Sequence, residues 1–289
     1  MVSVRSVFLC AALAAIGASV SAQQPLTLPR QSGSVRFAAI GDMGTGGRRQ
    51  YDVAARMDAS RQAFPFDFVI MLGDNIYGGN SAADFRSKFE LPYKPLLDAG
   101  VKFYASLGNH DSTTQRVYKP FNMDGKQYYT YKKGNAQFFA LDSNYMTPEQ
   151  LAWLEQELKG SNADWKIAYF HHPLYSSAMF HGSALELREV LEPLFVRYGV
   201  QAVFAGHEHV YERVKPQHGI TYFIEGAAGQ LRKSNLAKRD PLTAAGFDQD
   251  LSFMLVEITG DTLNFQTISR TGVTVDSGVI LRSARIETR

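Results

Sequence analysis

Short apolar segments alternate with longer amphipathic segments through most of the chain. Apolar runs bounded by Gly, Asp or Asn are typical of buried strands, and apolar residues that recur every three or four positions indicate helices. The pattern predicts strands over residues 34–40, 66–72, 101–107, 165–170 and 200–205. It predicts helices over residues 48–63, 82–97 and 184–198, and a further helix that Thr147 caps ahead of Pro148.

The remaining segments favour β structure. Runs over residues 127–132 and 136–142 flank Lys133-Gly134-Asn135, which is typical of a hairpin, and residues 220–280 are mostly alternating. Strands interleaved with helices favour an α/β fold in which helices cover the outer faces of packed sheets. The sequence shows no internal repeat and no long low-complexity segment between two halves, so one domain is expected.

Residues 1–22 have the pattern of a secretory signal peptide. Arg5 is their only charged residue, an apolar run covers residues 7–16, and Val20-Ser21-Ala22 supplies the small residues of a cleavage site. A transmembrane anchor is the alternative, but the apolar run is too short to span a bilayer. We therefore expect a secreted or periplasmic domain over residues 23–289 that has no membrane anchor after cleavage.

Composition narrows the classes of partner. Hydrophobic residues make up 45% of the chain, enough for a core that needs no disulfides, and the one cysteine, Cys10, lies in the predicted signal peptide. The formal net charge is only +2, so no general nucleic-acid-binding or membrane-binding surface is expected. The chain is expected to act as a monomer.

Nitrogen and oxygen donors follow the predicted strands in five short blocks. These are Asp42-Met43-Gly44, Gly73-Asp74-Asn75-Ile76-Tyr77, Gly108-Asn109-His110-Asp111, His171-His172 and Gly206-His207-Glu208-His209. Ligands bind at the carboxyl ends of strands in α/β sheets, so the blocks are expected to meet at one edge. They offer more donors than one tetrahedral ion can use, which favours two ions that share a bridging carboxylate. The glycine-rich stretch over residues 41–47 lacks the spacing of a nucleotide-binding loop.

The order of the blocks resembles the calcineurin-like metallophosphoesterases, and within them the purple acid phosphatases. That pattern reads Asp-x-Gly, Gly-Asp-x-x-Tyr, Gly-Asn-His-Asp/Glu, Val-x-x-His and Gly-His-x-His, and all five blocks occur here in order, with Ala168 in place of Val. Most relatives have Asp-x-His in the first block, whereas this chain has Gly44 there and Tyr77 in the second block, as in the purple subgroup. The resemblance implies an α/β fold of four layers, an α/β/β/α sandwich of two packed mixed sheets flanked by helices.

The resemblance also implies a set of metal ligands. One ion would be held by Asp42, Tyr77 and His209, the second by Asn109, His171 and His207, and Asp74 would bridge the two. A phenol has a pKa near ~10, so a tyrosine that binds as phenolate favours a strongly Lewis-acidic ion. We therefore expect Fe(3+) in the first position and a divalent ion, Fe, Zn or Mn, in the second.

Further residues are expected to act on the substrate. By the resemblance, His110 contacts the phosphate and helps the leaving group depart, while Asp111 orients His110 and raises its pKa. His181 lies where the family has substrate-site histidines. His172 competes with His171 as a ligand and is expected to line the site instead. Glu208 is expected to point away from the metals, into solvent or behind the ligands, because residues 207–209 are taken as extended.

The implied reaction is hydrolysis of a small phosphate monoester by hydroxide formed at the two cations, with an acidic optimum. Two rival functions stay open. A phosphodiesterase or nucleotidase could use the same metal pair. A non-hydrolytic metal-binding or phosphate-binding protein could keep the scaffold, but such a protein is expected to lose His110 or a ligand, and all of these residues are present.

Overall fold

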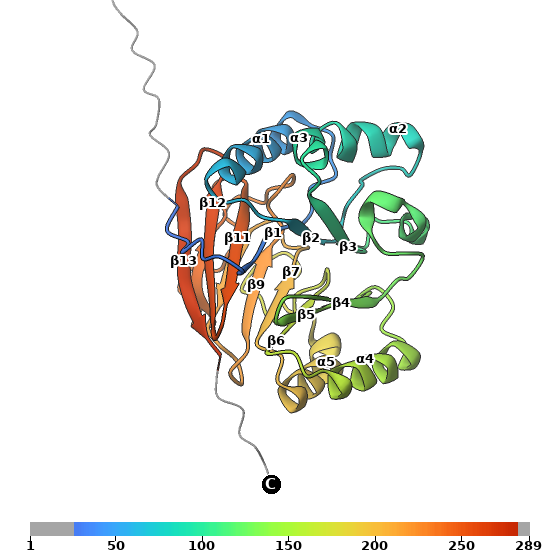
Figure 1. The fold of residues 1–289 in the computed structure, drawn as a ribbon, viewed down its shortest axis with the longest axis vertical. Helices are drawn as coiled ribbons and strands as arrows, with labels where there is room; N and C mark the ends of the chain where they lie inside the picture. The colour runs from blue at the N-terminus through green and yellow to red at the C-terminus, as the bar shows by residue number, and fades with distance from the viewer. Residues whose placement is uncertain (1–25, 283–289) are drawn as a thin grey trace, which may run out of the picture.

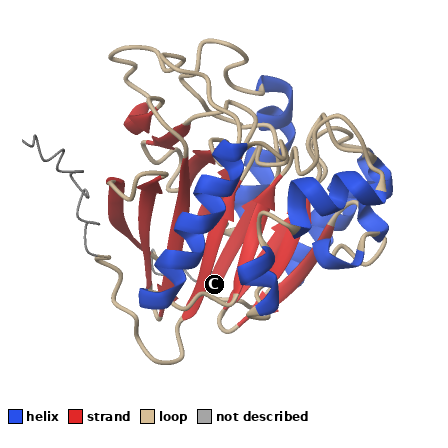
Figure 2. Cartoon of the chain, turned by 90° about the horizontal axis from the view of Figure 1, so that it is seen from above, coloured by secondary structure: helices blue, strands red, loops and turns tan. Residues whose placement is uncertain are grey.

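The chain forms a four-layer α/β/β/α sandwich, which confirms the predicted fold class. The computed structural model describes residues 26–282. Two sheets pack face to face in the middle, α1 to α3 lie beside the first sheet, and α4 and α5 lie beside the second (Figure 1). Figure 2 shows the helices lying against the strands in a view from above. The predicted signal peptide lies outside the described residues.

The first sheet has six strands in the order β13-β12-β11-β1-β2-β3. β1, β2 and β3 are parallel, while β11, β12 and β13 are antiparallel to their neighbours. The strands are β1 (Val35–Ile40), β2 (Phe68–Leu72), β3 (Lys102–Ser106), β11 (Ser252–Thr259), β12 (Thr262–Ser269) and β13 (Thr274–Leu281).

The second sheet has seven strands in the order β10-β8-β9-β7-β6-β5-β4. Its centre, β5, β6, β7 and β9, is parallel, and β4, β8 and β10 are antiparallel to their neighbours. The strands are β4 (Tyr129–Lys133), β5 (Ala136–Ala140), β6 (Trp165–Tyr169), β7 (Ala202–Ala205), β8 (Tyr211–Val214), β9 (Thr221–Glu225) and β10 (Thr243–Phe247).

Most of the helices connect parallel strands. They are α1 (Arg48–Ala63), α2 (Ala82–Phe85), the π-helix η1 (Arg86–Glu90), α3 (Lys94–Asp98), the 3-10 helices η2 (Thr113–Val117) and η3 (Lys119–Phe121), α4 (Pro148–Gly160) and α5 (Leu185–Tyr198). Between residues 26 and 282, no helix combines the length and the apolar character needed to cross a membrane.

The expected helical region over residues 82–97 is confirmed as α2, η1 and α3. A turn that contains Pro92, which has no backbone N–H to donate, separates η1 from α3. β8 was not predicted as a strand, because Glu212 and Arg213 hide its apolar pattern. The predicted cap of α4 is confirmed, since the Thr147 side chain accepts a hydrogen bond from the Gln150 N–H.

The main core lies between the two sheets. Phe37 of β1 is fully buried and contacts Phe68 of its own sheet at a ring-centroid distance of 5.3 Å. It also contacts Phe138 and Phe204 of the second sheet at 5.3 and 5.9 Å. A second core, which includes Phe195, lies between the second sheet and α4 and α5. These aromatic contacts pack the two sheets against each other.

Replacing Phe37 with Ala is expected to lower the free energy of unfolding by about 3–5 kcal/mol, because the ring leaves a cavity that both sheets line. Chemical denaturation of the purified protein measures this. Val117→Ala is the control: that side chain is 68% exposed, and the change is expected within about 0.5 kcal/mol of the parent. Equal effects of the two substitutions would contradict the role of Phe37.

Candidate metal centre

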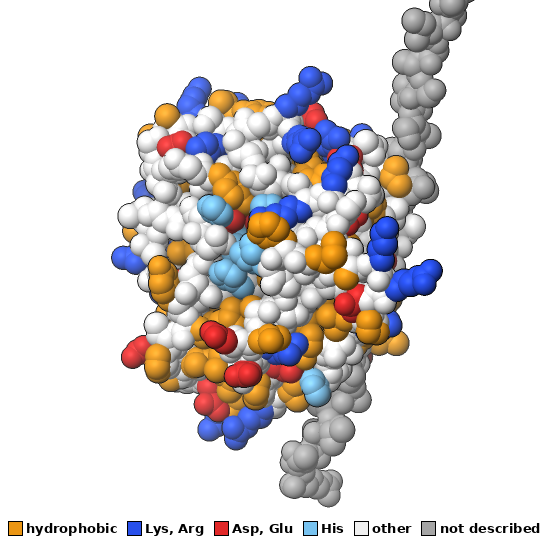
Figure 3. Space-filling view, turned by 180° about the vertical axis from the view of Figure 1, so that it is seen from behind, with side chains coloured by type: hydrophobic (Ala, Val, Ile, Leu, Met, Phe, Trp, Pro, Cys, Tyr) orange, Lys and Arg blue, Asp and Glu red, His pale blue; other side chains and the backbone are white. Residues whose placement is uncertain are grey.

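The five donor blocks meet where the two sheets meet. Each block follows one parallel strand: β1, β2 and β3 in the first sheet, β6 and β7 in the second. On the surface, histidines gather in one area of the face seen in Figure 3. Since all these strands end at the same edge, loops far apart in the sequence build one site.

Four of the predicted ligands have backbone conformations that are uncommon for residues other than glycine. The φ angles of Asp42, Asp74, His207 and His209 are 55°, 52°, 74° and 50°. Such angles persist only where the surrounding structure holds them, and they cluster at functional sites. The expectation that residues 207–209 are extended is wrong for this reason.

The backbones approach so closely that two glycines leave no room for a side chain. A Cβ on Gly108 would lie 2.2 Å from the backbone nitrogen of Asp74. A Cβ on Gly206 would lie 2.6 Å from Oδ2 of Asp42 and 2.8 Å from the carbonyl oxygen of Leu72. The glycine of these two blocks is therefore what lets the strand ends come together.

Asp42, Tyr77 and His209 form the first group of donors. The Tyr77 hydroxyl lies 3.2 Å from Oδ1 of Asp42 and 3.3 Å from Nε2 of His209, and Nε2 of His209 lies 3.2 Å from Oδ1 of Asp42. A Cβ on Gly44 would lie 1.9 Å from the carbonyl oxygen of Asn75. The structure thus has no space for a histidine at position 44, and a tyrosine from the second block completes this group.

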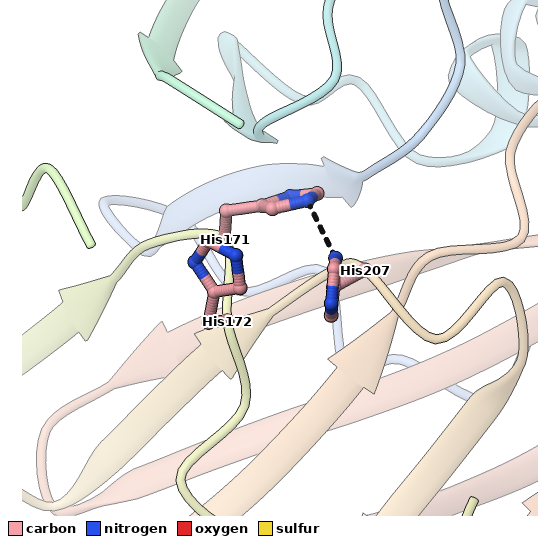
Figure 4. A group of neighbouring side chains, drawn as sticks. All are labelled: His171, His172 and His207. Carbon is pink, nitrogen blue, oxygen red and sulfur yellow. Dashed lines mark hydrogen bonds between the residues drawn. The ribbon is translucent and has the colours of Figure 1, made fainter. Parts of the chain in front are cut away.

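Asn109, His171 and His207 form the second group. Nδ1 of His171 lies 2.9 Å from the Leu72 carbonyl oxygen, which can only accept, so in the neutral ring Nδ1 carries the proton and Nε2 a lone pair. That Nε2 lies 2.9 Å from Oδ1 of Asn109 and 3.0 Å from Nδ1 of His207 (Figure 4). A nitrogen lone pair facing an amide oxygen at this distance is an arrangement that a cation satisfies.

Asp74 lies between the two groups. Its Oδ1 is 3.5 Å from Nε2 of His171, and a carboxylate oxygen of Asp74 lies within 4.8 Å of ligand atoms of Asp42 and His209. The same Oδ1 accepts a hydrogen bond from the backbone N–H of His110 at 2.9 Å. The structure therefore brings all seven predicted ligands together, with Asp74 next to both groups; its role as a bridge stays a prediction.

Burial sets the charge states of these groups. It raises the pKa of Asp42 well above its usual range, and the nearby Asp74 carboxylate raises it further. Burial also raises the pKa of the Tyr77 phenol, to which both carboxylates add. It lowers the pKa of His209 to about 4 and the pKa of His171 well below its usual value. Neutral imidazoles and crowded acidic groups fit bound cations, which supply the missing positive charge.

His110 and Asp111 lie at the site, but not as a pair. The His110 ring is exposed, with its centroid 5.0 Å from that of Tyr77. Asp111 accepts hydrogen bonds from the backbone N–H groups of Asn75, Ile76 and Gly108. Within residues 26–282 no hydrogen bond joins Asp111 to the His110 ring. The prediction that Asp111 orients His110 is therefore corrected: its carboxylate binds the loops of the second and third blocks together.

His181 lies beside the second group. Its ring stacks on that of His207 at a centroid distance of 4.0 Å. Nδ1 of His181 lies 3.2 Å from Nη1 of Arg232 and 3.6 Å from Oε1 of Glu208. Of the two places expected for Glu208, solvent is excluded, because its side chain is fully buried, and Asn235 donates a hydrogen bond to it at 3.3 Å.

His172 stays a neighbour of the ligands in this geometry. Its Nδ1 lies 2.9 Å from the Ser143 hydroxyl, and its ring centroid is 4.5 Å from that of His207. His171, His172 and His207 also offer nitrogens close enough to share an ion. The hydrogen bond of His171 to Leu72 favours His171 as the ligand, because it directs Nε2 toward Asn109.

Sequence reasoning missed Asn75 and Arg232. Asn75 is buried, and its amide donates to the Ser106 carbonyl at 2.8 Å and to Asp111 at 3.0 Å. Its position directly after Asp74 was the only sequence signal. In the sequence, Arg232 belongs to a basic stretch, residues 232–239, which could steer anionic substrates but is of a kind that is more often solvated. In the structure its guanidinium also lies over the Phe180 ring at 3.8 Å.

Named proteins with related sequences are phosphatases. Tartrate-resistant acid phosphatase type 5 of Mus musculus is 27% identical over 237 residues, which cover 67% of this chain and 72% of that protein. Purple acid phosphatase 17 of Arabidopsis thaliana is 29% identical over 236 residues, which cover 69% of this chain and 70% of that protein. Each of these two matches covers about two thirds of this chain.

Solved structures share the fold. A purple acid phosphatase from seeds of yellow lupin (Lupinus luteus) superposes with a TM-score of 0.76 at 20% identity, covering 89% of this chain and 55% of that chain. The anchor in the inner membrane complex of Plasmodium superposes with a TM-score of 0.75 at 17% identity, covering 88% of this chain and 90% of that chain. At these identities the likeness concerns the architecture alone.

The sequence model of one family extends across the whole candidate centre. Described as calcineurin-like phosphoesterase, it matches residues 35–211, from the start of β1 to the first residue of β8. All seven predicted ligands and His110 and His181 fall inside this range. Because the match covers well over half of the chain and includes each of the five donor blocks, the chain belongs to the calcineurin-like phosphoesterase family.

Proposed function

We propose that this protein is an exported acid phosphatase of the purple type, which hydrolyses phosphate monoesters at a dinuclear centre of Fe(3+) and a divalent ion. The observation that carries the proposal is the arrangement around Asp74, where one group of donors contains a phenol and the other contains only neutral donors. A phenolate next to two carboxylates suits a trivalent ion, and an amide with two imidazoles suits a divalent one.

The metal pair, when bound, supplies neutralisation of the phosphate oxygens and a more acidic water. The chain's own residues supply position and proton transfer. His171 is held by Leu72, so its ligand nitrogen has a fixed direction. His110 and His181 lie beside the Tyr77 and His207 groups respectively, where their rings can donate a proton to the oxygen of the departing alcohol.

Two rivals are separated by direct assays. A diesterase or nucleotidase would prefer bis(p-nitrophenyl) phosphate or a nucleotide over p-nitrophenyl phosphate. A non-hydrolytic protein would bind metal or phosphate without turnover, and the similar fold of the Plasmodium anchor shows that architecture alone does not decide the matter. The complete set of donors and His110 favours the enzyme.

Tyr77→Phe tests the ferric assignment. The wild-type protein is expected to show a broad visible absorption band from phenolate-to-iron charge transfer, and the variant is expected to lose it while hydrolysis remains measurable, because the other donors of that group stay. A visible spectrum together with metal analysis by mass spectrometry measures both. A colourless, iron-free and active wild type would refute Fe(3+) and point to a centre of other metals.

Asp74→Asn tests the bridge. Because Asp74 lies next to both groups, its substitution is expected to remove more metal per chain than Asn109→Ala, which affects the second group only. Asparagine accepts the positive φ of position 74, so the fold is expected to be kept, and circular dichroism checks this. Retention of two metals with near-normal turnover in Asp74→Asn would show that the bridge is wrongly assigned.

His110→Ala tests leaving-group assistance. Proton donation typically contributes ~10²–10⁴-fold, and it matters most for a basic leaving oxygen. The fall in kcat/KM is therefore expected to be much larger for glycerol phosphate than for p-nitrophenyl phosphate, with unchanged metal content. His218→Ala, at a side chain 63% exposed, is the matched control and is expected to change neither substrate. An equal loss on both substrates would assign His110 to phosphate binding instead.

A further inference from the structure

A cleft of about 700 Å³ opens beside the metal centre. Residues 107–113, the loop that carries His110, contribute to its lining, and so do residues 183–187, which follow His181. Asn109 and His172 line the cleft and also belong to the cluster around His171. The cleft is therefore continuous with the site, and its volume is in the range that holds small organic molecules.

The lining contains apolar side chains that the chain itself leaves uncovered. Tyr145 and Leu185 are 64% and 54% exposed, although both are large and apolar. Leu107 and Leu187 line the cleft with them. Apolar side chains gathered in a concave surface are typical of a ligand site, because a bound apolar group removes them from water.

The charge of the lining is negative. No Lys or Arg is among the residues that line the cleft, and the carboxylates are those of Asp111 and Glu186. The backbone N–H groups of neighbouring loops already bind Asp111. Glu186 is exposed in the first turn of α5, where the helix dipole favours a negative charge. Figure 3 shows acidic and hydrophobic side chains near the histidines on this face.

The metal centre, unlike the cleft, has a positively charged side chain beside it, that of Arg232. Its guanidinium lies against His181 and does not line the cleft. A monoester bound with its phosphate at the metals and its alcohol portion in the cleft thus meets positive charge at the phosphate and negative charge at the alcohol. A second anionic group on the alcohol would face Glu186 without a compensating cation.

We infer that this cleft holds the leaving group and selects phosphate monoesters whose alcohol has an apolar, aromatic-sized body and no negative charge, with Glu186 and Leu185 as specificity-determining residues. The inference rests on the proposed function of the metal centre. Nucleotides and other substrates with a second anionic group are expected to have a lower kcat/KM, because Glu186 repels that group.

The test compares three esters that share one phosphate: phenyl phosphate, 4-carboxyphenyl phosphate and methyl phosphate. Glu186→Lys is expected to raise the ratio of kcat/KM for 4-carboxyphenyl phosphate over phenyl phosphate by about fivefold, as reversal of one partly screened charge allows. Asp98→Lys, which makes a like charge reversal at a carboxylate that is 62% exposed and lies outside the cleft lining, is the control and is expected to leave the ratio within about twofold.

Leu185→Ser tests the apolar part of the cleft lining. It is expected to raise KM for phenyl phosphate by about five- to tenfold with little change in kcat, and to leave methyl phosphate unaffected. Leu185→Met is expected to restore the parent KM. Because Leu185 is more than half exposed, the fold is expected to tolerate each change.

Binding of the matching phosphonates to metal-loaded protein, measured by calorimetry, separates the two proposals. A protein that hydrolyses none of the esters but binds phenylphosphonate more tightly than the carboxylated and methyl compounds would refute the phosphatase activity. It would still support the cleft as the site that selects the organic group. If all three esters are hydrolysed and neither Glu186→Lys nor Leu185→Ser changes the ratios of kcat/KM between them, the role of the cleft is refuted and the phosphatase activity is supported. Equal binding of the three phosphonates would also overturn the cleft.

Discussion

The hydrogen bond from Nδ1 of His171 to the carbonyl oxygen of Leu72 joins the two sheets at the point where the metal centre is built. Leu72 is the last residue of β2 and His171 follows β6, so the bond crosses from one sheet to the other. It is fully buried, and water does not compete with it. The same bond fixes which nitrogen of His171 carries the proton, so the packing of the sheets and the chemistry of the site depend on one contact.

The location of the site could be predicted from the sequence because its physical cause is local. A strand that ends in glycine and is followed by Asp or His places a donor at the sheet edge, and parallel strands bring such edges together. Gly108 and Gly206 are examples of such glycines, since neither position has room for a Cβ. The start of helix α4 was predictable for a similar reason, because the signal is local: Thr147 caps the helix and Pro148 is its first residue.

The parts that sequence reasoning missed depend on contacts between distant segments. Asp111 was assigned to its neighbour His110, whereas its oxygens accept from Asn75 and Ile76, a choice that only the packed loops determine. Glu208 was expected to point away from the metals, into solvent or behind the ligands, because alternation was assumed. The positive φ of His207 and His209 ends that alternation, and residues from the loop around Asn235 cover the carboxylate. Periodicity describes one segment at a time and holds no information on what covers it.

The left-handed backbone of Asp42, Asp74, His207 and His209 has an evolutionary consequence. Each such residue costs on the order of 1 kcal/mol or more, and glycine would adopt the same angles freely. Selection for turnover therefore retains at these positions amino acids that selection for stability alone would remove. A lineage released from catalysis would gain stability by losing these ligands first while the surrounding sheets stay intact. Recovery of the four donors after such a loss would need several destabilising substitutions at once.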